Sequence, residues 1–283
     1  MNKIILPNSY NYIGIFLTMR CSLSCSYCIN NFGTVKKDWK ELSGREWIKG
    51  LSRILTREDL PLSLQGGEPF LHPDFYPIIT ELGHEEKFMD VLTNGMFDSE
   101  KFERETYINT FRTTAKYAGI RFSFHQNTNM IGLAIKVWGL VRNGYSCGIW
   151  GLKHPEMEER NAEMKDLCKW LGIDYREKEY LDFNYDGYKY PEAILGKEKK
   201  HVKCKPSEML IAPDGSIYRC HSDLYSGRNQ QGHILDKNVE LATDFISCDN
   251  YGLCNPCDIK IKNSRFQIWG HTSVEIKDCI DKL

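Results

Sequence analysis

The stretch Tyr12-Ile-Gly-Ile-Phe-Leu-Thr-Met-Arg-Cys21-Ser-Leu-Ser-Cys25-Ser-Tyr-Cys28 joins an apolar, strand-like run to three closely spaced cysteines. Three thiolates with the spacing Cys-x3-Cys-x2-Cys can surround one soft metal centre, and thiolates favour iron–sulfur clusters or zinc. A [4Fe–4S] cluster takes four ligands, so this motif would leave one iron open to a small molecule. A structural zinc site is the alternative, although such a site usually has four protein ligands.

Length and composition limit the class of protein. The chain has 283 residues, which suits one large domain with an appendage. Its net charge is −1 and its main basic run is Lys197–His201, which argues against a nucleic-acid partner. It contains no run of about 18 apolar residues and no signal-peptide pattern, so we expect a cytoplasmic protein without a membrane partner. Eleven cysteines in such a chain favour metal ligands over disulfides.

The cysteine motif, with the aromatic Tyr27 before its last cysteine, resembles the signature of the radical S-adenosylmethionine (SAM) family. The resemblance implies that Cys21, Cys25 and Cys28 hold a [4Fe–4S] cluster whose open iron is chelated by SAM, with Tyr27 beside this cofactor. In that family the reduced cluster cleaves SAM, and the resulting 5′-deoxyadenosyl radical abstracts a hydrogen atom from the substrate.

A second motif, Gly66-Gly67-Glu68-Pro69, follows the strand expected at residues 61–65. Two glycines let a backbone approach a ligand closely, and a carboxylate can accept hydrogen bonds from an ammonium group. An ordinary turn is the alternative. The motif also resembles the family's Gly-Gly-Glu-Pro, which implies that Gly66, Gly67 and Glu68 bind the amino group of SAM.

Two further segments resemble the family's later strands. Thr93-Asn94-Gly95 resembles a Thr-Asn-Gly whose Asn lies near SAM, although a turn after a strand would look the same. Gly119–His125 alternates as a half-buried strand. The family places polar side chains of this strand against SAM, which implies contacts from Ser123 and His125. A packed histidine is the alternative for His125.

The strand expected at Ser146–Trp150 leads into Gly148-Ile-Trp-Gly151, which loosely resembles the segment that flanks adenine in the family. This resemblance implies a SAM contact from Ile149. Cys147 and Cys168 fall inside expected elements and are interpreted as core thiols.

Six expected strands alternate with helices, a pattern typical of a parallel sheet. The strands are expected at residues 12–17, 61–65, 87–93, 119–125, 146–150 and 173–178. Each candidate ligand follows a strand and should lie at the C-terminal edge of the sheet, where such barrels place their chemistry. The resemblance implies an α/β fold with a partial (β/α)6 TIM-like barrel, which we assign to residues 1–195.

Helix boundaries can also be predicted. Ser43-Gly-Arg-Glu46 is a capping box that begins a helix, and Gly83 is expected to end the helix at residues 73–82. A further helix is expected at residues 127–142. Its buried face is predicted to carry Ile131, Ile135, Trp138 and Val141.

A second cysteine set follows, with a hairpin at Ile211–Tyr218 that turns at Asp214-Gly215. The spacing Cys204-x10-Gly215-x4-Cys220 and the closing pair Cys254-Asn-Pro-Cys257 resemble the twitch and SPASM auxiliary-cluster domains. The resemblance implies an auxiliary [4Fe–4S] cluster in a small C-terminal domain at residues 196–260, followed by a tail at residues 261–283. Its implied ligands are Cys204, Cys220, Cys254 and Cys257. A zinc ribbon is the alternative, and Cys248 is a fifth candidate ligand.

These features imply a radical SAM oxidoreductase that oxidises a small polar metabolite of the sugar or aminocyclitol type, with a flavodoxin- or ferredoxin-type electron donor. The start of the chain close to its first strand favours a small molecule over a peptide, because peptide-modifying relatives commonly carry a leader-binding domain. An epimerase or a peptide-modifying enzyme that uses Cys248 as hydrogen donor is an alternative. A non-catalytic iron–sulfur electron carrier is an alternative of another class.

Overall fold

The computed structural model describes residues 2–25, 28, 38–57, 59–111, 117–179, 200–251 and 275–279. Its main feature is a nine-stranded sheet with the strand order β12-β11-β10-β2-β4-β5-β6-β7-β8. Six of these strands run parallel to their neighbours and confirm the expected α/β fold. They are β2 (Tyr12–Thr18), β4 (Leu62–Gly66), β5 (Met89–Thr93), β6 (Ile120–Ser123), β7 (Cys147–Lys153) and β8 (Asp174–Glu179). Within the described ranges the sheet is open, with β8 and β12 as its edges.

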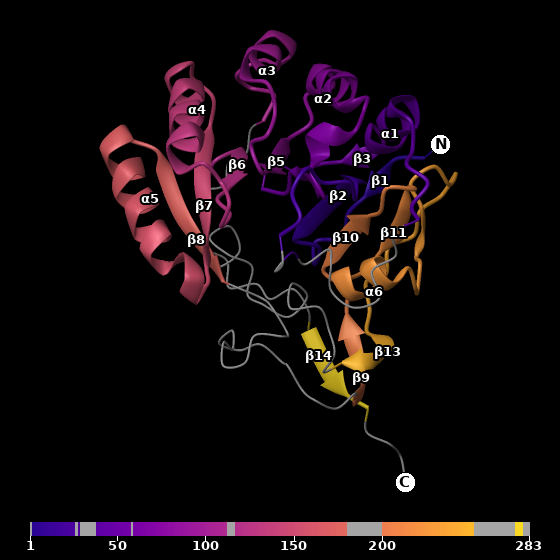
Figure 1. Cartoon of the computed structure of the whole chain (residues 1–283). Helices are drawn as coiled ribbons and strands as arrows, with labels where there is room; N and C mark the ends of the chain where they lie inside the picture. Colours follow the sequence, from indigo (N-terminus) through magenta and orange to yellow (C-terminus); the bar gives the residue numbers. More distant parts are fainter. Residues whose placement is uncertain are drawn as a thin grey trace.

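Five helices lie along one side of this sheet, as Figure 1 shows. They are α1 (Gly44–Leu51), α2 (Phe75–His84), α3 (Ser99–Glu105), α4 (Met130–Arg142) and α5 (Glu158–Leu171). Side chains of β2 alternate between the two faces: Ile13, Ile15 and Leu17 enter the core beneath the helices, whereas Phe16 enters a smaller cluster on the other face. The parallel strands therefore have apolar contacts on both faces, as βαβ units require.

Local signals explain where most helices begin and end. The Ser43 hydroxyl and the Glu46 carboxylate form the expected capping box of α1, and Gly172 ends α5 with a φ of 71°. The expected stop of α2 at Gly83 is wrong, since the helix continues to His84. Glu86 reverses the chain instead, with a φ of 57° and a hydrogen bond from its N–H to the Gly83 carbonyl.

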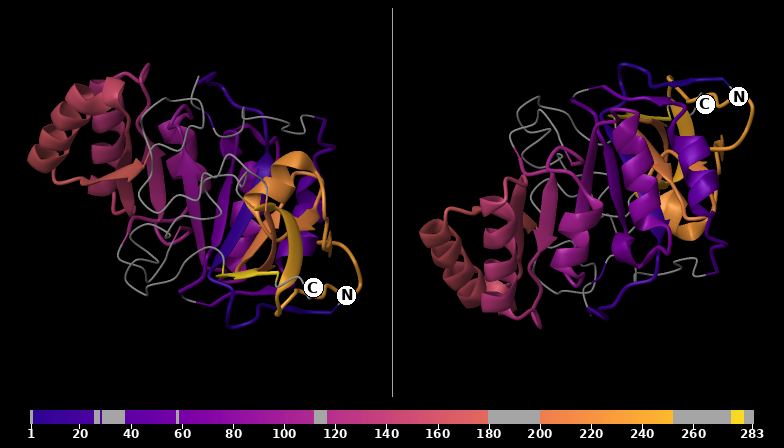
Figure 2. Two further views of the ribbon diagram at one scale, coloured as in Figure 1. Left: turned by 90° about the horizontal axis from the view of Figure 1, so that it is seen from below. Right: turned by 90° about the horizontal axis from the view of Figure 1, so that it is seen from above.

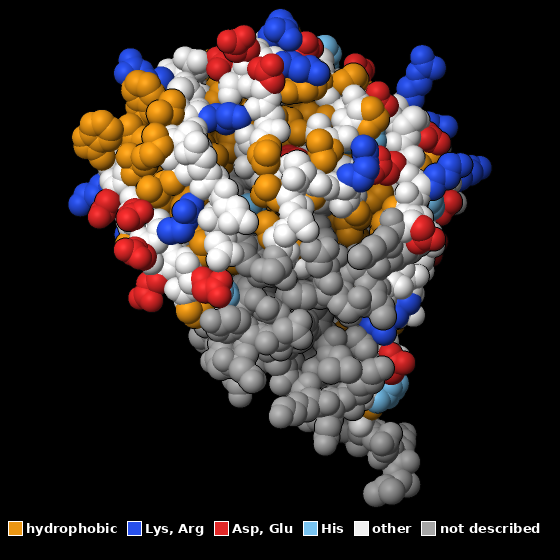
Figure 3. All heavy atoms as spheres, in the orientation of Figure 1, with side chains coloured by type: hydrophobic (Ala, Val, Ile, Leu, Met, Phe, Trp, Pro, Cys, Tyr) orange, Lys and Arg blue, Asp and Glu red, His pale blue; other side chains and the backbone are white. Residues whose placement is uncertain are grey.

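The predicted buried face of α4 is wrong for Ile131 and Ile135, whereas Trp138 and Val141 are half-buried against the core as expected. Ile131 and Ile135 are 52% and 59% exposed. The buried residues are Leu133, Ala134, Val137 and Leu140. The sequence of α4 is apolar almost all round, so its pattern did not decide which stripe faces the sheet. Figure 3 shows hydrophobic side chains gathered over α4 and α5, and the exposed large hydrophobic residues of these two helices are Ile131, Ile135 and Trp170.

The expected hairpin is present, but it extends the main sheet. It comprises β10 (Glu208–Ile211) and β11 (Ser216–Tyr218), and β10 pairs in parallel with β2. Pairing at this second edge of β2 satisfies backbone groups that would otherwise form an open edge. The hairpin is therefore part of the main sheet, and the assignment of residues 196–260 to an auxiliary-cluster domain stays a prediction. Figure 2 shows the hairpin end of the sheet far from α5.

The remaining elements complete the hairpin end. Strand β12 (Gly232–His233) pairs with β11, and helix α6 (His221–Ser226) packs with Phe16 in the smaller cluster. A separate three-stranded sheet consists of β9 (Lys200–Lys205), β13 (Ile246–Tyr251) and β14 (Glu275–Asp278), and β1 (Ile4–Ile5) pairs with β3 (Ile54–Leu55). Among the described helices, none has the length and apolar character needed to cross a bilayer.

Candidate functional site

Three loops meet where β2, β4 and β5 end. The loop after β2 carries Cys21, the loop after β4 begins at Gly67, and the loop after β5 begins at Asn94. Backbone hydrogen bonds join the first two loops, from Gly67 N to the Thr18 carbonyl (2.8 Å) and from Glu68 N to the Arg20 carbonyl (2.7 Å). Segments that are distant in the sequence therefore share one edge of the sheet, as parallel pairing requires.

The two glycines allow this close contact between loops. Gly66 has a φ of +136°, and a Cβ at this position would collide with the Thr18 carbonyl oxygen. A Cβ at Gly67 would collide with the carbonyl oxygen of Arg20. We expected the glycines to admit a ligand. In the structure the close approach at both positions is made by the backbone that leads into Cys21.

Glu68 fastens the loop after β4 to the loop after β5. Its side chain is 1% exposed, and it accepts hydrogen bonds from Thr93 Oγ1 (2.9 Å) and Asn94 N (2.7 Å). Phe70 N donates to the same carboxylate at 3.3 Å. Burial raises the pKa of Glu68, and these hydrogen bonds oppose the rise. A carboxylate has about four acceptor positions, so one remains for a ligand.

Asn94 connects the loop after β5 to the cysteine loop. Its side-chain amide donates to Ser22 Oγ (3.1 Å) and lies 3.7 Å from the sulfur of Cys21. Its side-chain oxygen accepts a hydrogen bond from Met96 N (2.9 Å), which fixes the orientation of the amide. We expected Asn94 near SAM, and the structure places it against the first cysteine of the motif.

Lys136 of α4 supports the same loop from outside. Its ammonium donates to the carbonyls of Gly95 (2.7 Å) and Phe97 (2.5 Å) and lies over the Phe97 ring. Burial lowers the pKa of Lys136. Sequence reasoning missed this residue, because nothing in the sequence links it to a loop 41 positions away.

A charged clamp holds the start of the cysteine loop. Arg20 donates to both carboxylate oxygens of Glu41, at 3.0 Å and 2.8 Å, and Thr18 Oγ1 also donates to Glu41. Partial burial works against the charge on Glu41, but the hydrogen bonds from Arg20 and Thr18 hold its pKa below the ordinary value. The clamp was not predicted, since its residues lie outside every motif.

The three thiols of the motif lie on one short loop. Cys21 is exposed, Cys25 and Cys28 are half-buried, and a hydrogen bond joins Cys28 N to the Cys25 carbonyl (3.1 Å). Among the described residues no three His, Cys, Asp or Glu side chains lie close enough to hold one metal ion. A four-iron cluster is larger than one ion and holds its ligands farther apart. Three sulfur donors, of which Cys21 lies beside the Asn94 amide, fit such a cluster, and their ligand roles stay predictions. Tyr27 lies outside the described residues.

Ser123 and His125 lie on the next strand along the edge. Ser123 ends β6, and the backbone of His125 exchanges hydrogen bonds with Thr128, at 3.1 Å and 3.0 Å. Burial, together with the positive charge of Lys178, lowers the pKa of His125 to about 4. The imidazole is therefore neutral at neutral pH, and contact with SAM stays a prediction for both residues.

Ile149 does not lie at this edge. It sits inside β7, between β6 and β8, and its side chain is fully buried in the main core. The contact with adenine that the loose resemblance assigned to Ile149 stays a prediction, and this buried side chain does not support it. The core role predicted for Cys147 and Cys168 is confirmed, and burial raises the pKa of Cys168 to about 12.

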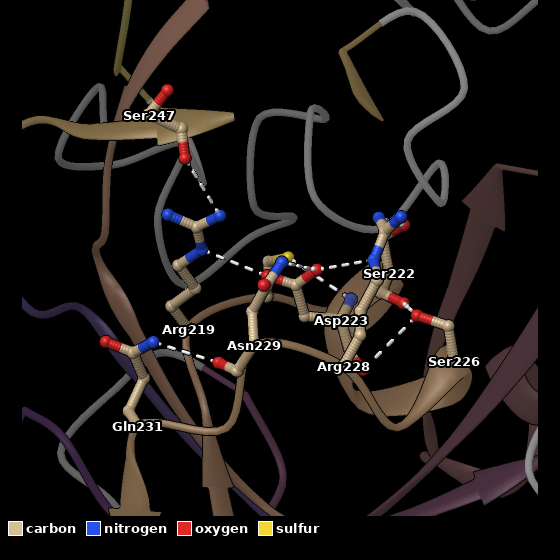
Figure 4. A network of polar contacts seen from close by, with 9 residues as sticks. Arg219, Ser222, Asp223, Ser226, Arg228, Asn229, Gln231 and Ser247 are labelled. Atoms are coloured by element: carbon tan, nitrogen blue, oxygen red, sulfur yellow. Dashed lines mark hydrogen bonds and ion pairs between the residues drawn. The ribbon is translucent and has the colours of Figure 1, made fainter. Parts of the chain in front are cut away.

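Members of the second cysteine set gather near β13. Cys204 lies in β9, Cys248 lies in β13, and Cys220 precedes α6 and accepts a hydrogen bond from Asp223 N (3.4 Å). Cys254 and Cys257 lie outside the described residues. Figure 4 shows the polar network at this place. The Asp223 carboxylate accepts hydrogen bonds from Arg219 (2.9 Å), Arg228 (2.8 Å) and Asn229 (3.1 Å). The network was not predicted from the sequence.

Residues 15–113, which include the three interlocked loops, match the family model of the radical SAM superfamily. This part of the chain is a radical SAM domain. The cofactors that such a domain implies are SAM and a [4Fe–4S] cluster, and the residues of the cysteine loop have the sulfur chemistry that such a cluster requires. The second cluster is not part of this conclusion.

The curated relatives include proteins with two different names. The chain is 28% identical over 203 residues to molybdenum cofactor biosynthesis protein 1 of Bos taurus, covering 67% of this chain and 31% of the relative. It is 23% identical over 195 residues to a GTP 3′,8-cyclase of Listeria welshimeri, covering 66% and 59%. The chain therefore spans about a third of the bovine relative's length and less than two thirds of the bacterial one's.

Solved structures support the fold. Streptococcus suis SuiB bound to S-adenosylmethionine superposes with a TM-score of 0.57 at 16% identity, covering 81% of this chain and 64% of SuiB. The structure of anSMEcpe with bound AdoMet superposes with a TM-score of 0.55 at 16% identity, covering 80% and 78%. At this identity the likeness concerns the fold alone.

Proposed function

We propose that this chain is a radical SAM enzyme that removes a hydrogen atom from a small polar metabolite and oxidises it. The observation that carries the proposal is the bonding of the three loops after β2, β4 and β5, which brings Cys21, Glu68 and Asn94 together. When bound, the cluster and SAM would supply the 5′-deoxyadenosyl radical. A simple electron carrier needs none of the glycine–glutamate and Thr-Asn-Gly loops that this edge contains.

Each residue at the edge has a distinct task in the proposal. Cys21, Cys25 and Cys28 would hold the cluster. Glu68 and Asn94 keep the cysteine loop in place, and the remaining acceptor position of Glu68 would receive the amino group of SAM. The neighbouring Ser123 and the neutral His125 would contribute uncharged hydrogen bonds to SAM.

An oxidation needs an acceptor for one further electron after the hydrogen atom is removed. The product is then two hydrogens lighter than the substrate, and one proton goes to solvent. The second cysteine set, which includes Cys204, Cys220 and Cys248, supplies the residues that would hold such an electron acceptor. An electron donor of the flavodoxin or ferredoxin type would supply the electron that starts the reaction.

A purine nucleotide is a second candidate substrate, because several curated relatives carry the name GTP 3′,8-cyclase. A peptide substrate is a third, since the SuiB structure with its precursor peptide shares the fold. An epimerisation that uses Cys248 as hydrogen donor would give a product with the mass of the substrate. These candidates differ in the compound that stimulates SAM cleavage and in the mass of the product.

The proposal can be tested by anaerobic incubation of the reduced protein with SAM in deuterated water. Sugars, aminocyclitols, GTP and a no-substrate control are compared for the rate of 5′-deoxyadenosine formation. We expect stimulation by a sugar or aminocyclitol and a product two hydrogens lighter without solvent label at carbon. Stimulation by GTP alone would favour the nucleotide. A product with one solvent deuterium at an inverted carbon would favour epimerisation, and no 5′-deoxyadenosine with any addition would contradict the proposal.

A further inference from the structure

Two cysteines share one face of the three-stranded sheet. In the antiparallel pair of β9 and β13, Cys204 lies opposite Ile246 and Cys248 lies opposite Val202. Residues two positions apart on a strand point to the same face, so the two thiols are diagonal neighbours on it, at about 7–8 Å. This face is the covered one, since Val202 is 1% exposed and both cysteines are half-buried. The opposite face carries the exposed residues His201, Lys203 and Ser247.

Arg219 brings a third cysteine to the same place. Its Nη2 donates to the carbonyl of Ser247 (3.3 Å), the residue before Cys248, and Cys220 directly follows Arg219 in the chain. Burial works against the charge on Arg219, but the hydrogen bond and the charge of Asp223 keep its pKa above the ordinary value. The guanidinium group of Arg219 thus joins the segment that carries Cys220 to the strand that carries Cys248.

The network around Arg219 has an excess of positive charge. One carboxylate, that of Asp223, is shared by Arg219 and Arg228, and Figure 4 shows both guanidinium groups directed at it. Arg219 is 8% exposed, and its Nη1 has no hydrogen-bond partner within the described part of the chain. A buried guanidinium N–H group without a hydrogen-bond partner favours an acceptor at this position. A cluster held by thiolates is such an acceptor.

We propose that Cys248, together with Cys204 and Cys220, is a ligand of the second iron–sulfur cluster, and that Arg219 is the buried cation that donates a hydrogen bond to it. This inference rests on the second cluster of the proposed function. It changes the ligand set expected from the twitch resemblance. It also removes Cys248 as hydrogen donor, because a ligating thiolate has no S–H group to give.

The ligand set is tested in a variant whose first site is removed by Cys21→Ala, Cys25→Ala and Cys28→Ala. After anaerobic reconstitution we expect about four irons per chain and the EPR signal of one reduced [4Fe–4S] cluster. Adding Cys248→Ala should remove most of the iron. Adding Cys279→Ala, the matched control at a half-buried cysteine that follows β14, should leave iron and signal unchanged.

Full iron and an unchanged signal in the Cys248→Ala variant would overturn the ligand assignment. So would a parent variant that binds no iron at all. Neither result depends on SAM cleavage, which is measured separately in the unaltered chain. A failure of the proposed function is therefore distinguishable from a failure of this inference.

The role of Arg219 is tested by redox titration of the second cluster. Reduction adds negative charge beside the guanidinium, so Arg219→Gln should lower the midpoint potential, and Arg219→Lys should restore part of the loss. Arg228→Gln is the matched control, because Arg228 binds the other oxygen of Asp223 and its side chain is 34% exposed. Equal shifts in the Arg219→Gln and Arg228→Gln variants, or no shift in either, would contradict a direct role of Arg219.

Discussion

Glu68 accepts hydrogen bonds from Thr93, Asn94 and Phe70 before any ligand arrives. Glu68→Gln keeps the shape of the side chain but replaces one acceptor oxygen with a donor. That NH2 group would face another buried donor, so we expect the free energy of unfolding of the SAM-free protein to fall by about 1–3 kcal/mol. Urea denaturation of the SAM-free protein measures the change.

Glu81→Gln serves as the control for this variant, because Glu81 lies on the exposed side of α2. Its effect on the free energy of unfolding should stay within about 0.5 kcal/mol. If Glu68→Gln were equally harmless and weakened only SAM binding, Glu68 would be a ligand-binding residue without the structural task described above.

His125 gives the protein a sensitivity to acid. Its pKa in the folded state is about 4, because burial and Lys178 disfavour the imidazolium ion, whereas an unfolded histidine titrates near 6.5. As pH falls below 6.5, the unfolded state takes up this proton first, so stability is lost progressively down to about pH 4. Between pH 7.5 and 5.5 the loss should be about 1 kcal/mol.

This loss is measured by anaerobic urea denaturation at the two pH values. His125→Gln should make the protein less sensitive to this change by about the same amount, whereas His84→Gln, at a surface position, should not. An unchanged pH dependence in the His125→Gln variant would show that His125 is not held neutral by its surroundings.

At the scale of single residues, the sequence could predict which side chains lie at the edge of the sheet but not what they contact. Glu68 and Asn94 follow strands and therefore had to lie at the C-terminal edge. Their hydrogen bonds depend on the distance between neighbouring loops, which no local pattern encodes. Ile149 shows the opposite case. A loose motif assigned a ligand contact to this residue, but its side chain lies in the core between the strand and the helices.

At the scale of elements, the contact between the loops after β2 and β4 depends on Gly67. Gly67→Ala would drive a methyl group into the carbonyl oxygens of Met19 and Arg20. We expect a loss of about 1–3 kcal/mol in the free energy of unfolding, together with a lower iron content of the first site. Gly83→Ala in α2 is the control, because no atom lies within 4 Å of the added methyl group.

The control should be neutral or stabilising by up to about 1 kcal/mol, since alanine favours a helix over glycine. Urea denaturation and iron analysis measure both variants. Wild-type stability and iron content in the Gly67→Ala variant would contradict the packing of these two loops.

The buried face of α4 can be verified in the same way. Leu140 is 1% exposed, so Leu140→Ala should cost about 2–5 kcal/mol of unfolding free energy. Ile135 is more than half exposed, and Ile135→Ala should stay within about 0.5 kcal/mol. The reverse order of effects would mean that the face predicted from the sequence, with Ile135 buried, is the correct one.

Elements with strong local signals were predictable. All six parallel strands and the capping box at Ser43 occur where the sequence places them. The end of α2 was predicted too early, because Gly83 is still part of the helix. Glu86, which has a positive φ, makes the turn instead. The joining of β10 to β2 is a long-range pairing, and hydrophobic periodicity does not reveal the partner of a strand.

At the scale of the whole molecule, the parallel order of strands brings together segments that are far apart in the chain. Cys21, Glu68 and Asn94 occupy successive loops of one edge, and Lys136 supports them from α4. At the hairpin end, Arg219 joins the main sheet to the small sheet through Ser247. The meeting of the three loops follows from the βαβ order that the sequence shows. The contact of Arg219 with Ser247 depends on tertiary packing and could not be predicted.

The central claim is that the loop at Cys21, Cys25 and Cys28 holds the cluster at which SAM is cleaved. The most direct measurement is anaerobic 5′-deoxyadenosine formation by a variant with all three cysteines changed to Ala, compared with the unaltered chain. The account predicts that this variant forms no 5′-deoxyadenosine while the EPR signal of a second cluster persists. Formation of 5′-deoxyadenosine at the rate of the unaltered chain would contradict it.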